Sequence, residues 1–163
     1  MTPTNTVTNG ARPVTEIGQG HVVVSVELAA DAERVFRALA SHEVVQWWVR
    51  PGVFDTTEWT GDARVGGRWR ASGRIRGGPY AIEGEFLELD SPRRLVHTWR
   101  GVGAPGGPTT VEYALERLAG GTRVTLRHSG FPSREAGAGF GAGWETSFAR
   151  LAEILAAERP TPP

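Results

Sequence analysis

The stretch from Ala138 to Glu158 reads AGFGAGWETSFARLAEILAAE, and it is the one segment long enough for a helix of several turns. Its large apolar residues recur at steps of three or four, which is the period of an amphipathic helix: Phe140, Trp144, Phe148, Leu151 and Leu155. A helix with three aromatic rings on one face needs a large apolar partner. We therefore expect the rest of the chain to supply that surface.

The start of this helix is rich in glycine, with Gly137, Gly139, Gly141 and Gly143 at alternate positions. Each interior glycine costs a helix about 1 kcal/mol relative to alanine. We therefore expect a weak first turn and a mobile stretch from Phe131 to Gly143.

Length and charge narrow the class of protein. A chain of 163 residues is expected to form one domain. Its 18 cationic residues, all arginine, balance 18 acidic ones, so nucleic acid and acidic membranes are not expected as partners. The absence of cysteine excludes disulfides, a thiol nucleophile and cysteine-bound metal.

The two ends of the chain read as tails. Residues 1–18 and 159–163 offer little apolar area and are expected to be disordered, which leaves a domain over 19–158. No signal peptide and no apolar run of about 18 residues is recognisable. We therefore expect a cytoplasmic protein, monomeric or homodimeric, with no membrane partner.

The pattern of the remaining chain predicts one strand, two short helices and six more strands. The strand covers 21–28, and Asp31 is expected to cap a helix over 32–40 that precedes a second helix over 42–49. The later strands are expected at 55–60, 68–76, 79–86, 95–102, 109–118 and 122–129. The order β-α-α-β-β-β-β-β-β-α predicts an α+β domain in which a curved antiparallel sheet of about seven strands wraps around the long helix.

Gly77-Gly78 is expected to form a two-residue hairpin turn. That register pairs Trp69 with Phe86 on an apolar face and Arg70 with Glu85 on a charged face. We interpret the arginine-rich face as solvated surface, because exposed cross-strand ion pairs are ordinary.

Three small residues, Gly73, Ala71 and Gly84, lie in the middle of the apolar face. They either admit a close-packed aromatic ring or leave a cavity, and a cavity of a few hundred Å³ is roughly the size of a small-molecule site. The residues expected to contact a ligand there are Trp47, Trp48, Trp59, Trp69, Ile82, Phe86, His97, Trp99, Tyr113, His128, Phe131, Phe140, Trp144 and Phe148.

A second turn at Gly120-Gly121 would pair Tyr113 with His128, and His97 is also expected to face inward. Two readings of Tyr113 and His128 stay open. They either give the cavity a hydrogen-bonding end or an acid–base pair, or they satisfy each other and the nearby backbone. No residue is assigned a catalytic role.

Trp47 and Trp48 close the second short helix, and we expect at most one of them to face the core. The other is expected to line the cavity entrance or to pack simply. The four histidines are far apart in sequence and show no metal-binding spacing, so neither a metal site nor a cofactor is predicted.

Several motifs together resemble the activator-of-Hsp90-ATPase-homologue (AHSA1-like) family of the START-like superfamily, over roughly residues 20–157. They are Val-Phe-Arg-Ala-Leu (35–39), Gln-Trp-Trp (46–48), Gly-Gly-Arg-Trp (66–69), Leu-Val-His-Thr-Trp (95–99), Thr-Leu-Arg-His-Ser-Gly (125–130) and Gly-Trp (143–144). The resemblance implies the helix-grip fold, in which a curved sheet holds a long C-terminal helix.

The superfamily includes lipid carriers, hormone receptors and polyketide cyclases, so the resemblance implies a small hydrophobic ligand, expected to be aromatic or polycyclic. The double Trp, the Gly-Gly-Arg-Trp turn and the Gly-Trp pair also resemble the self-sacrifice resistance proteins of enediyne producers. Those proteins are thought to bind the antibiotic and absorb its radical chemistry at a backbone glycine. A polyketide cyclase and an Hsp90-activator-like interaction module are the remaining alternatives.

Overall fold

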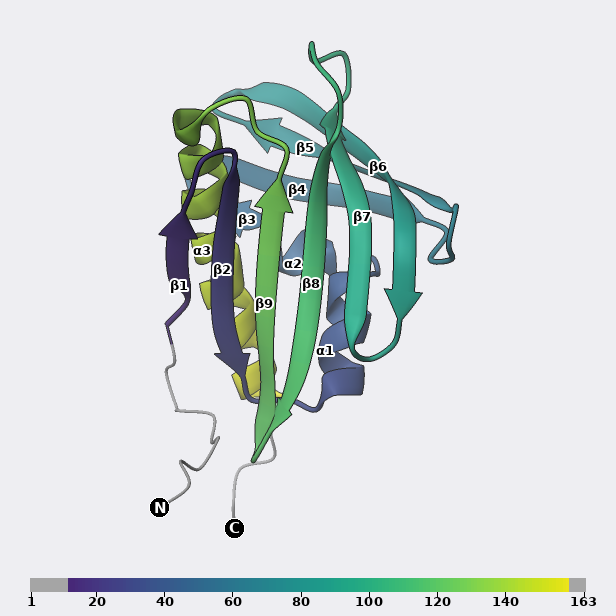
Figure 1. Cartoon of the computed structure of the whole chain (residues 1–163), viewed down its shortest axis with the longest axis vertical. Coiled ribbons are helices and arrows are strands. Elements are labelled where there is room, and N and C mark those ends of the chain that lie inside the picture. The colour runs from purple at the N-terminus through teal and green to yellow at the C-terminus, as the bar shows by residue number, and fades with distance from the viewer. Residues whose placement is uncertain (1–11, 159–163) are drawn as a thin grey trace.

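The computed structural model describes residues 12–158 (Figure 1). One antiparallel sheet has the strand order β1-β2-β9-β8-β7-β6-β5-β4-β3. The elements in chain order are β1 (Val14–Ile17), β2 (His21–Leu28), α1 (Ala32–Leu39), α2 (Val44–Trp47), β3 (Val49–Arg50), β4 (Phe54–Gly61), β5 (Arg68–Ile75), β6 (Gly78–Asp90), β7 (Arg94–Gly101), β8 (Thr109–Leu118), β9 (Gly121–Ser129) and α3 (Arg134–Ala157). The predicted helix-grip α+β fold is confirmed.

The sheet is strongly curved. Figure 1 shows β2, β9, β8 and β7 running along the long axis, while β4 and β5 cross behind their upper ends. Bulges between Thr56 and Glu58 in β4 and between Phe86 and Glu88 in β6 interrupt the pairing, and bulges bend strands locally. The α3 helix lies against the concave face, α1 packs on the lower part of β8 and β9, and α2 lies between β4 and α3.

Two strands were not predicted. β1 pairs with β2 along the sheet edge. Residues 14–17 were expected to belong to a disordered tail, and that expectation is wrong. The Thr15 hydroxyl also donates a hydrogen bond of 2.8 Å to Glu145 on α3. β3 is two residues long and pairs with β4, too short to be recognised by alternation. The remaining tail residues, 1–11 and 159–163, lie outside the described part of the chain.

The α3 helix begins four residues earlier than the expected glycine-weakened start. Ser133 caps it by accepting a hydrogen bond from the backbone N–H of Ala136 at 3.1 Å. A Cβ atom at Gly137 would lie 3.3 Å from Val22, and one at Gly141 would lie 3.5 Å from it. These two glycines therefore let the helix backbone approach β2 closely, and the packing offsets their low helix propensity.

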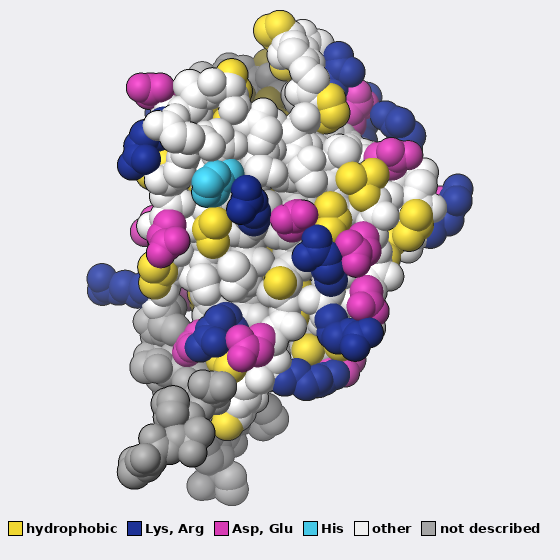
Figure 2. Space-filling model, viewed as in Figure 1, with side chains coloured by type: hydrophobic (Ala, Val, Ile, Leu, Met, Phe, Trp, Pro, Cys, Tyr) yellow, Lys and Arg dark blue, Asp and Glu magenta, His cyan; other side chains and the backbone are white. Residues whose placement is uncertain are grey.

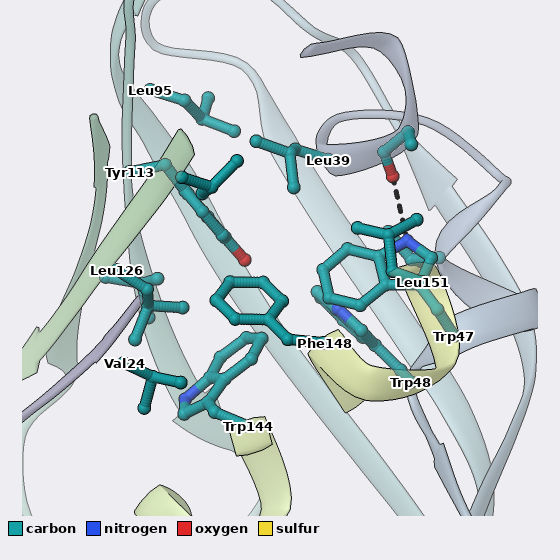
Figure 3. Close-up of a cluster of buried hydrophobic side chains, with 14 of the residues drawn as sticks. Val24, Leu39, Trp47, Trp48, Leu95, Tyr113, Leu126, Trp144, Phe148 and Leu151 are labelled. Atoms are coloured by element: carbon teal, nitrogen blue, oxygen red, sulfur yellow. Dashed lines mark hydrogen bonds between the residues drawn. The ribbon is translucent and has the colours of Figure 1, made fainter. Parts of the chain in front are cut away.

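The core lies between α3, the short helices and the sheet (Figure 3). Trp47 stacks on Phe148 with ring centroids 5.8 Å apart, and its indole N–H donates to the carbonyl of Ala38 at 3.0 Å. Trp47 and Trp48 are 1% and 4% exposed, so the expectation that at most one of them faces the core is wrong. The core accommodates Trp48 as well, because this residue follows the last residue of α2 and its ring packs edge-on against Trp47.

Both predicted hairpin registers are wrong by two residues. Ile75 pairs with Gly78, so Arg76 and Gly77 form the first turn, with positive φ angles of 42° and 83°. Leu118 likewise pairs with Gly121. In each hairpin the second glycine is the first residue of a strand. A shift of two residues keeps every side chain on its face, so the apolar and charged faces are as predicted.

The convex face of the sheet is a mixed charged surface. Figure 2 shows arginine and acidic side chains interspersed over it. Arg123 pairs with Glu27 and Glu116, and Arg94 pairs with Glu88 and Glu112. Within the described residues, no helix combines the length and apolar character that crossing a membrane requires.

The small residues at the centre of the sheet admit a close-packed ring. Trp69 lies opposite Gly84, and a Cβ atom on Gly84 would overlap both the Trp69 indole and the Thr98 carbonyl oxygen. This arrangement fills the centre of the concave face.

We expect Gly84→Ala to lower the free energy of unfolding by about 1–3 kcal/mol, because the backbone of Thr98 cannot move away cheaply. Urea denaturation at neutral pH measures the change. Gly107→Ala is the matched control, because its Cβ would meet nothing within 4 Å, and its stability should stay within about 0.5 kcal/mol of the parent. Equal stability of the two variants would contradict the packing of Trp69 on Gly84.

Candidate functional site

A pocket of about 370 Å³ opens between the first half of α3 and the end of the sheet formed by β3 to β6. Its lining combines aromatic rings, aliphatic side chains and bare helix backbone. The lining residues are Trp48, Arg50, Val53, Phe54, Thr56, Ile75, Tyr80, Ile82, Trp99, Ala136, Gly139, Phe140, Gly143, Trp144 and Ser147.

Large apolar side chains flank the mouth of the pocket. Ile75 on the sheet side is 44% exposed, and Phe140 on the helix side is 37% exposed. Phe140 contacts Trp99 edge-on, with ring centroids 6.0 Å apart. A Cβ atom at Gly139 would meet nothing within 4 Å, so this part of the helix wall has room in front of it.

The structure brings five of the fourteen predicted site residues to this pocket: Trp48, Ile82, Trp99, Phe140 and Trp144. The other nine do not line it. Trp47, Trp69, Phe86, His97, Tyr113, His128, Phe131 and Phe148 are buried in the core, and Trp59 is half-buried on β4.

Sequence reasoning missed the sheet-side wall, which contains Arg50, Val53, Phe54, Thr56 and Tyr80. The alternation of Phe54 and Thr56 on one face of β4 was the available signal. It was obscured because β3, the partner of this segment, is two residues long.

Most polar groups of the pocket lie on the sheet side, and Ser147 is the polar side chain that α3 contributes. The Thr56 and Tyr80 hydroxyls hydrogen-bond to each other, and burial raises the pKa of Tyr80. The backbone N–H of Thr56 donates to the Trp48 carbonyl at 3.3 Å. The indole N–H of Trp48 is buried without a hydrogen-bond partner among the described residues.

His128 lies in a chain of hydrogen bonds that uses both of its ring nitrogens. The Trp144 indole N–H donates to His128 Nδ1 at 3.1 Å, so the ring proton must be on Nε2. His128 Nε2 then donates to the Thr109 hydroxyl at 2.7 Å, and this hydroxyl donates to the Trp99 carbonyl at 3.1 Å. The neutral imidazole thus fixes Trp99 and Trp144, two walls of the pocket.

The expected pairing of Tyr113 with His128 is wrong. Tyr113 lies opposite Leu126, and His128 lies opposite Val111. The Tyr113 hydroxyl points toward Phe148 in the core (Figure 3) and has no hydrogen-bond partner within residues 12–158. Burial raises its pKa, so it stays protonated.

His97 and His128 are both buried, and desolvation lowers the pKa of His97 to about 4 and that of His128 to about 3. His97 Nδ1 donates to the Thr98 carbonyl at 2.9 Å. Both rings are therefore neutral at physiological pH. No group of three or more metal-ligating side chains occurs in the described residues.

A long helix held by a curved antiparallel sheet, with an apolar pocket between them, defines a START-like helix-grip domain. Residues 29–156 match the model of the family described as activator of Hsp90 ATPase homolog 1-like protein. The chain belongs to this family. No curated protein matches it significantly.

Solved structures share the fold. The protein CV1439 from Chromobacterium violaceum is 26% identical with a TM-score of 0.73, covering 83% of this chain and 96% of its own. NE0264 from Nitrosomonas europaea is 25% identical with a TM-score of 0.72, covering 86% and 96%. The solution structure of CalU16 from Micromonospora echinospora is 22% identical with a TM-score of 0.67, covering 96% and 81%.

The buried neutral histidines make stability depend on pH. In the unfolded chain a histidine has a pKa of about 6.5. Below that pH the unfolded state binds more protons, so the free energy of unfolding should fall by up to about 1.4 kcal/mol per pH unit for each of His97 and His128. Urea denaturation between about pH 6.5 and pH 5, above the range in which carboxylates titrate, measures the slope.

His128→Gln should remove about half of that slope, because one titrating group is lost. His42→Gln is the control, since His42 is exposed in the turn before α2, and it should leave the slope unchanged. A free energy of unfolding that is constant over this range in the parent protein would contradict the burial of two neutral imidazoles.

Proposed function

We propose that this protein binds a small hydrophobic ligand with aromatic or polycyclic rings in the pocket between α3 and the sheet. The main support for this proposal is the pocket itself, whose volume of about 370 Å³ falls in the range of small-molecule sites. The driving force is removal of apolar ligand surface from water, at about 25 cal/mol per Å².

The composition of the walls supports aromatic rings as the ligand. Trp48, Trp99, Phe140 and Trp144 offer ring faces and edges to the pocket, and aromatic rings prefer offset-stacked or edge-to-face partners. Exposed Phe140 and Ile75 at the mouth lose water contact when a ligand enters. Membership in the family is consistent with this role.

The lining favours binding over acid–base catalysis. Among its residues there is no His, Asp or Glu side chain. The buried His97 and His128 are outside it, and their ring nitrogens bond to the backbone, Thr109 and Trp144. A cyclase would need a general base within reach of the substrate. The one phenol of the lining, Tyr80, does not supply it, because burial raises its pKa and keeps the hydroxyl protonated.

Self-resistance to an antibiotic is a second candidate role for the same pocket. The observation that favours it is the helix wall, where Gly139 presents its backbone to the pocket with no side chain in front of it. Gly143 also lines the pocket, but there a Cβ atom would already lie 3.5 Å from the Phe54 ring. The resemblance to self-sacrifice proteins implies cleavage at a backbone glycine within reach of the drug.

Exposure of the protein to a reductively activated enediyne tests this role. Cleavage at Gly139 or Gly143, seen by intact-mass spectrometry as two complementary fragments, is the expected result for a resistance protein. An intact chain, or cleavage scattered over exposed glycines, would exclude the self-sacrifice mechanism and leave simple binding.

Filling the pocket should abolish ligand binding without unfolding the protein. The probe is N-phenyl-1-naphthylamine, an uncharged aromatic compound. We expect it to raise the melting temperature of the parent protein by about 2 °C or more at saturating concentration. In Gly139→Phe this shift should vanish, because the new ring occupies open space in the pocket.

Ala142→Phe is the control, since Ala142 is exposed on the same helix and outside the lining. It adds a phenyl ring of the same size and should keep the parent's shift. The proposal fails if the probe shifts neither protein, or if it shifts Gly139→Phe as much as Ala142→Phe.

A further inference from the structure

The lining of the pocket is mostly apolar but includes one charged side chain. Arg50, half-buried at the end of β3, is the sole charged residue of its lining. Within the described part of the chain, its guanidinium makes no ion pair and no hydrogen bond. Other arginines are satisfied, as Arg94 and Arg123 each pair with two carboxylates.

Strand geometry directs the side chain of Arg50 to the pocket and the side chain of Asp55, on the neighbouring strand, away from it. Arg50 is the cross-strand partner of Phe54, and partners point to the same face. Asp55 follows Phe54 on β4, so its side chain points to the opposite face, where its partners are Val49 and Arg74. No carboxylate among the pocket residues offsets the charge of Arg50.

The surroundings of the mouth add positive charge. A shallow depression next to the pocket shares Val53 and Phe54 with it and also contains Arg76 and Arg150. Its other two charged residues, Arg74 and Asp55, are cross-strand partners of opposite charge on the other face of the sheet. Arg150 is held in place because its Nε donates to the Gln46 carbonyl at 2.6 Å. The potential at this end therefore favours anions.

The two walls of the pocket differ in character. The sheet wall has Arg50, the unpartnered indole N–H of Trp48 and the Thr56–Tyr80 hydroxyl pair. The helix wall is formed by Ala136, Gly139, Phe140, Gly143, Trp144 and Ser147, so it is uncharged and Ser147 is its one polar side chain. A ligand that matches both walls has rings at one end and a hydrogen-bond acceptor with negative charge at the other.

We propose that the ligand class of this pocket is an amphipathic organic monoanion, with its rings against α3 and its acidic group on Arg50. This inference rests on the proposed function, because it specifies the ligand of the same site. One guanidinium matches one carboxylate or sulfonate, which it binds through two parallel hydrogen bonds.

Two probes with one skeleton test the inference. 8-Anilinonaphthalene-1-sulfonate carries a sulfonate, and N-phenyl-1-naphthylamine is the same ring system without it. By isothermal titration calorimetry at low salt, the parent protein should bind the sulfonate about tenfold or more tightly than the neutral compound. Raising the salt concentration from about 50 mM to about 500 mM should lower the affinity for the sulfonate and leave the affinity for the neutral probe unchanged.

Arg50→Gln should reduce affinity for the sulfonate about tenfold and change affinity for the neutral probe less than about twofold. Arg50→Lys keeps the charge and should retain part of the preference. Arg100→Gln removes an exposed arginine outside the pocket lining and should change neither affinity.

The outcomes separate the two proposals. Equal affinities for both probes, or equal losses for both in Arg50→Gln, would overturn the acidic-ligand inference while keeping the ligand pocket. Binding of neither probe would overturn the proposed function as well. Should Arg50→Gln not fold, the salt dependence of the parent protein decides, and a sulfonate affinity independent of salt would overturn the inference.

Discussion

The fold is built around a close contact between α3 and the edge of the sheet formed by β1 and β2. Gly137 faces Val22 of β2, and Gly141 faces Thr15 of β1, where Cβ atoms would lie 3.3 Å and 3.2 Å from the respective side chains. With no Cβ at these two positions, the helix backbone lies directly on this edge of the sheet. This contact sets how far Trp144 and Phe148 reach into the concave face, where they meet Trp47. Larger residues at the two glycines would lift the helix and open the core that these rings fill.

The same geometry explains why a pocket remains at one end. Along β7 to β9 the concave face is filled by Tyr113, His97 and the indoles, and Trp69 occupies the space above Gly84. Beyond that point the sheet curves, so that β4 and β5 run across the direction of β7 to β9 (Figure 1). Here α3 faces the sheet partly with glycines, which have no side chain to fill the space. Curvature and bare backbone together leave a space that the protein's own aromatic rings do not fill.

The sequence was sufficient for the fold and for about a third of the pocket lining, five residues of fifteen. Periodicity identified the helix, and alternation identified the faces, which survived a two-residue register error because side chains alternate with period two. The register error arose because each turn contains two adjacent glycines, and the sequence does not indicate which of the two is the first residue of the following strand. The sheet-side wall was missed because Arg50 and Thr56 depend on a two-residue strand. His128 was misassigned because the register error placed Tyr113 opposite it, whereas its hydrogen-bond partners are Thr109 and Trp144.

In the proposed complex the rings of the ligand lie between α3 and β6 and not in the aromatic core. Intermolecular nuclear Overhauser effects between bound N-phenyl-1-naphthylamine and the isotope-labelled protein locate those rings. We predict contacts to Gly139 Hα, the Ile82 methyls and the Phe140 ring, and none to Tyr113 or Phe86, which lie outside the lining. Contacts centred on Tyr113 and Phe86 would contradict the account, because the ligand would then occupy space that the structure fills with side chains.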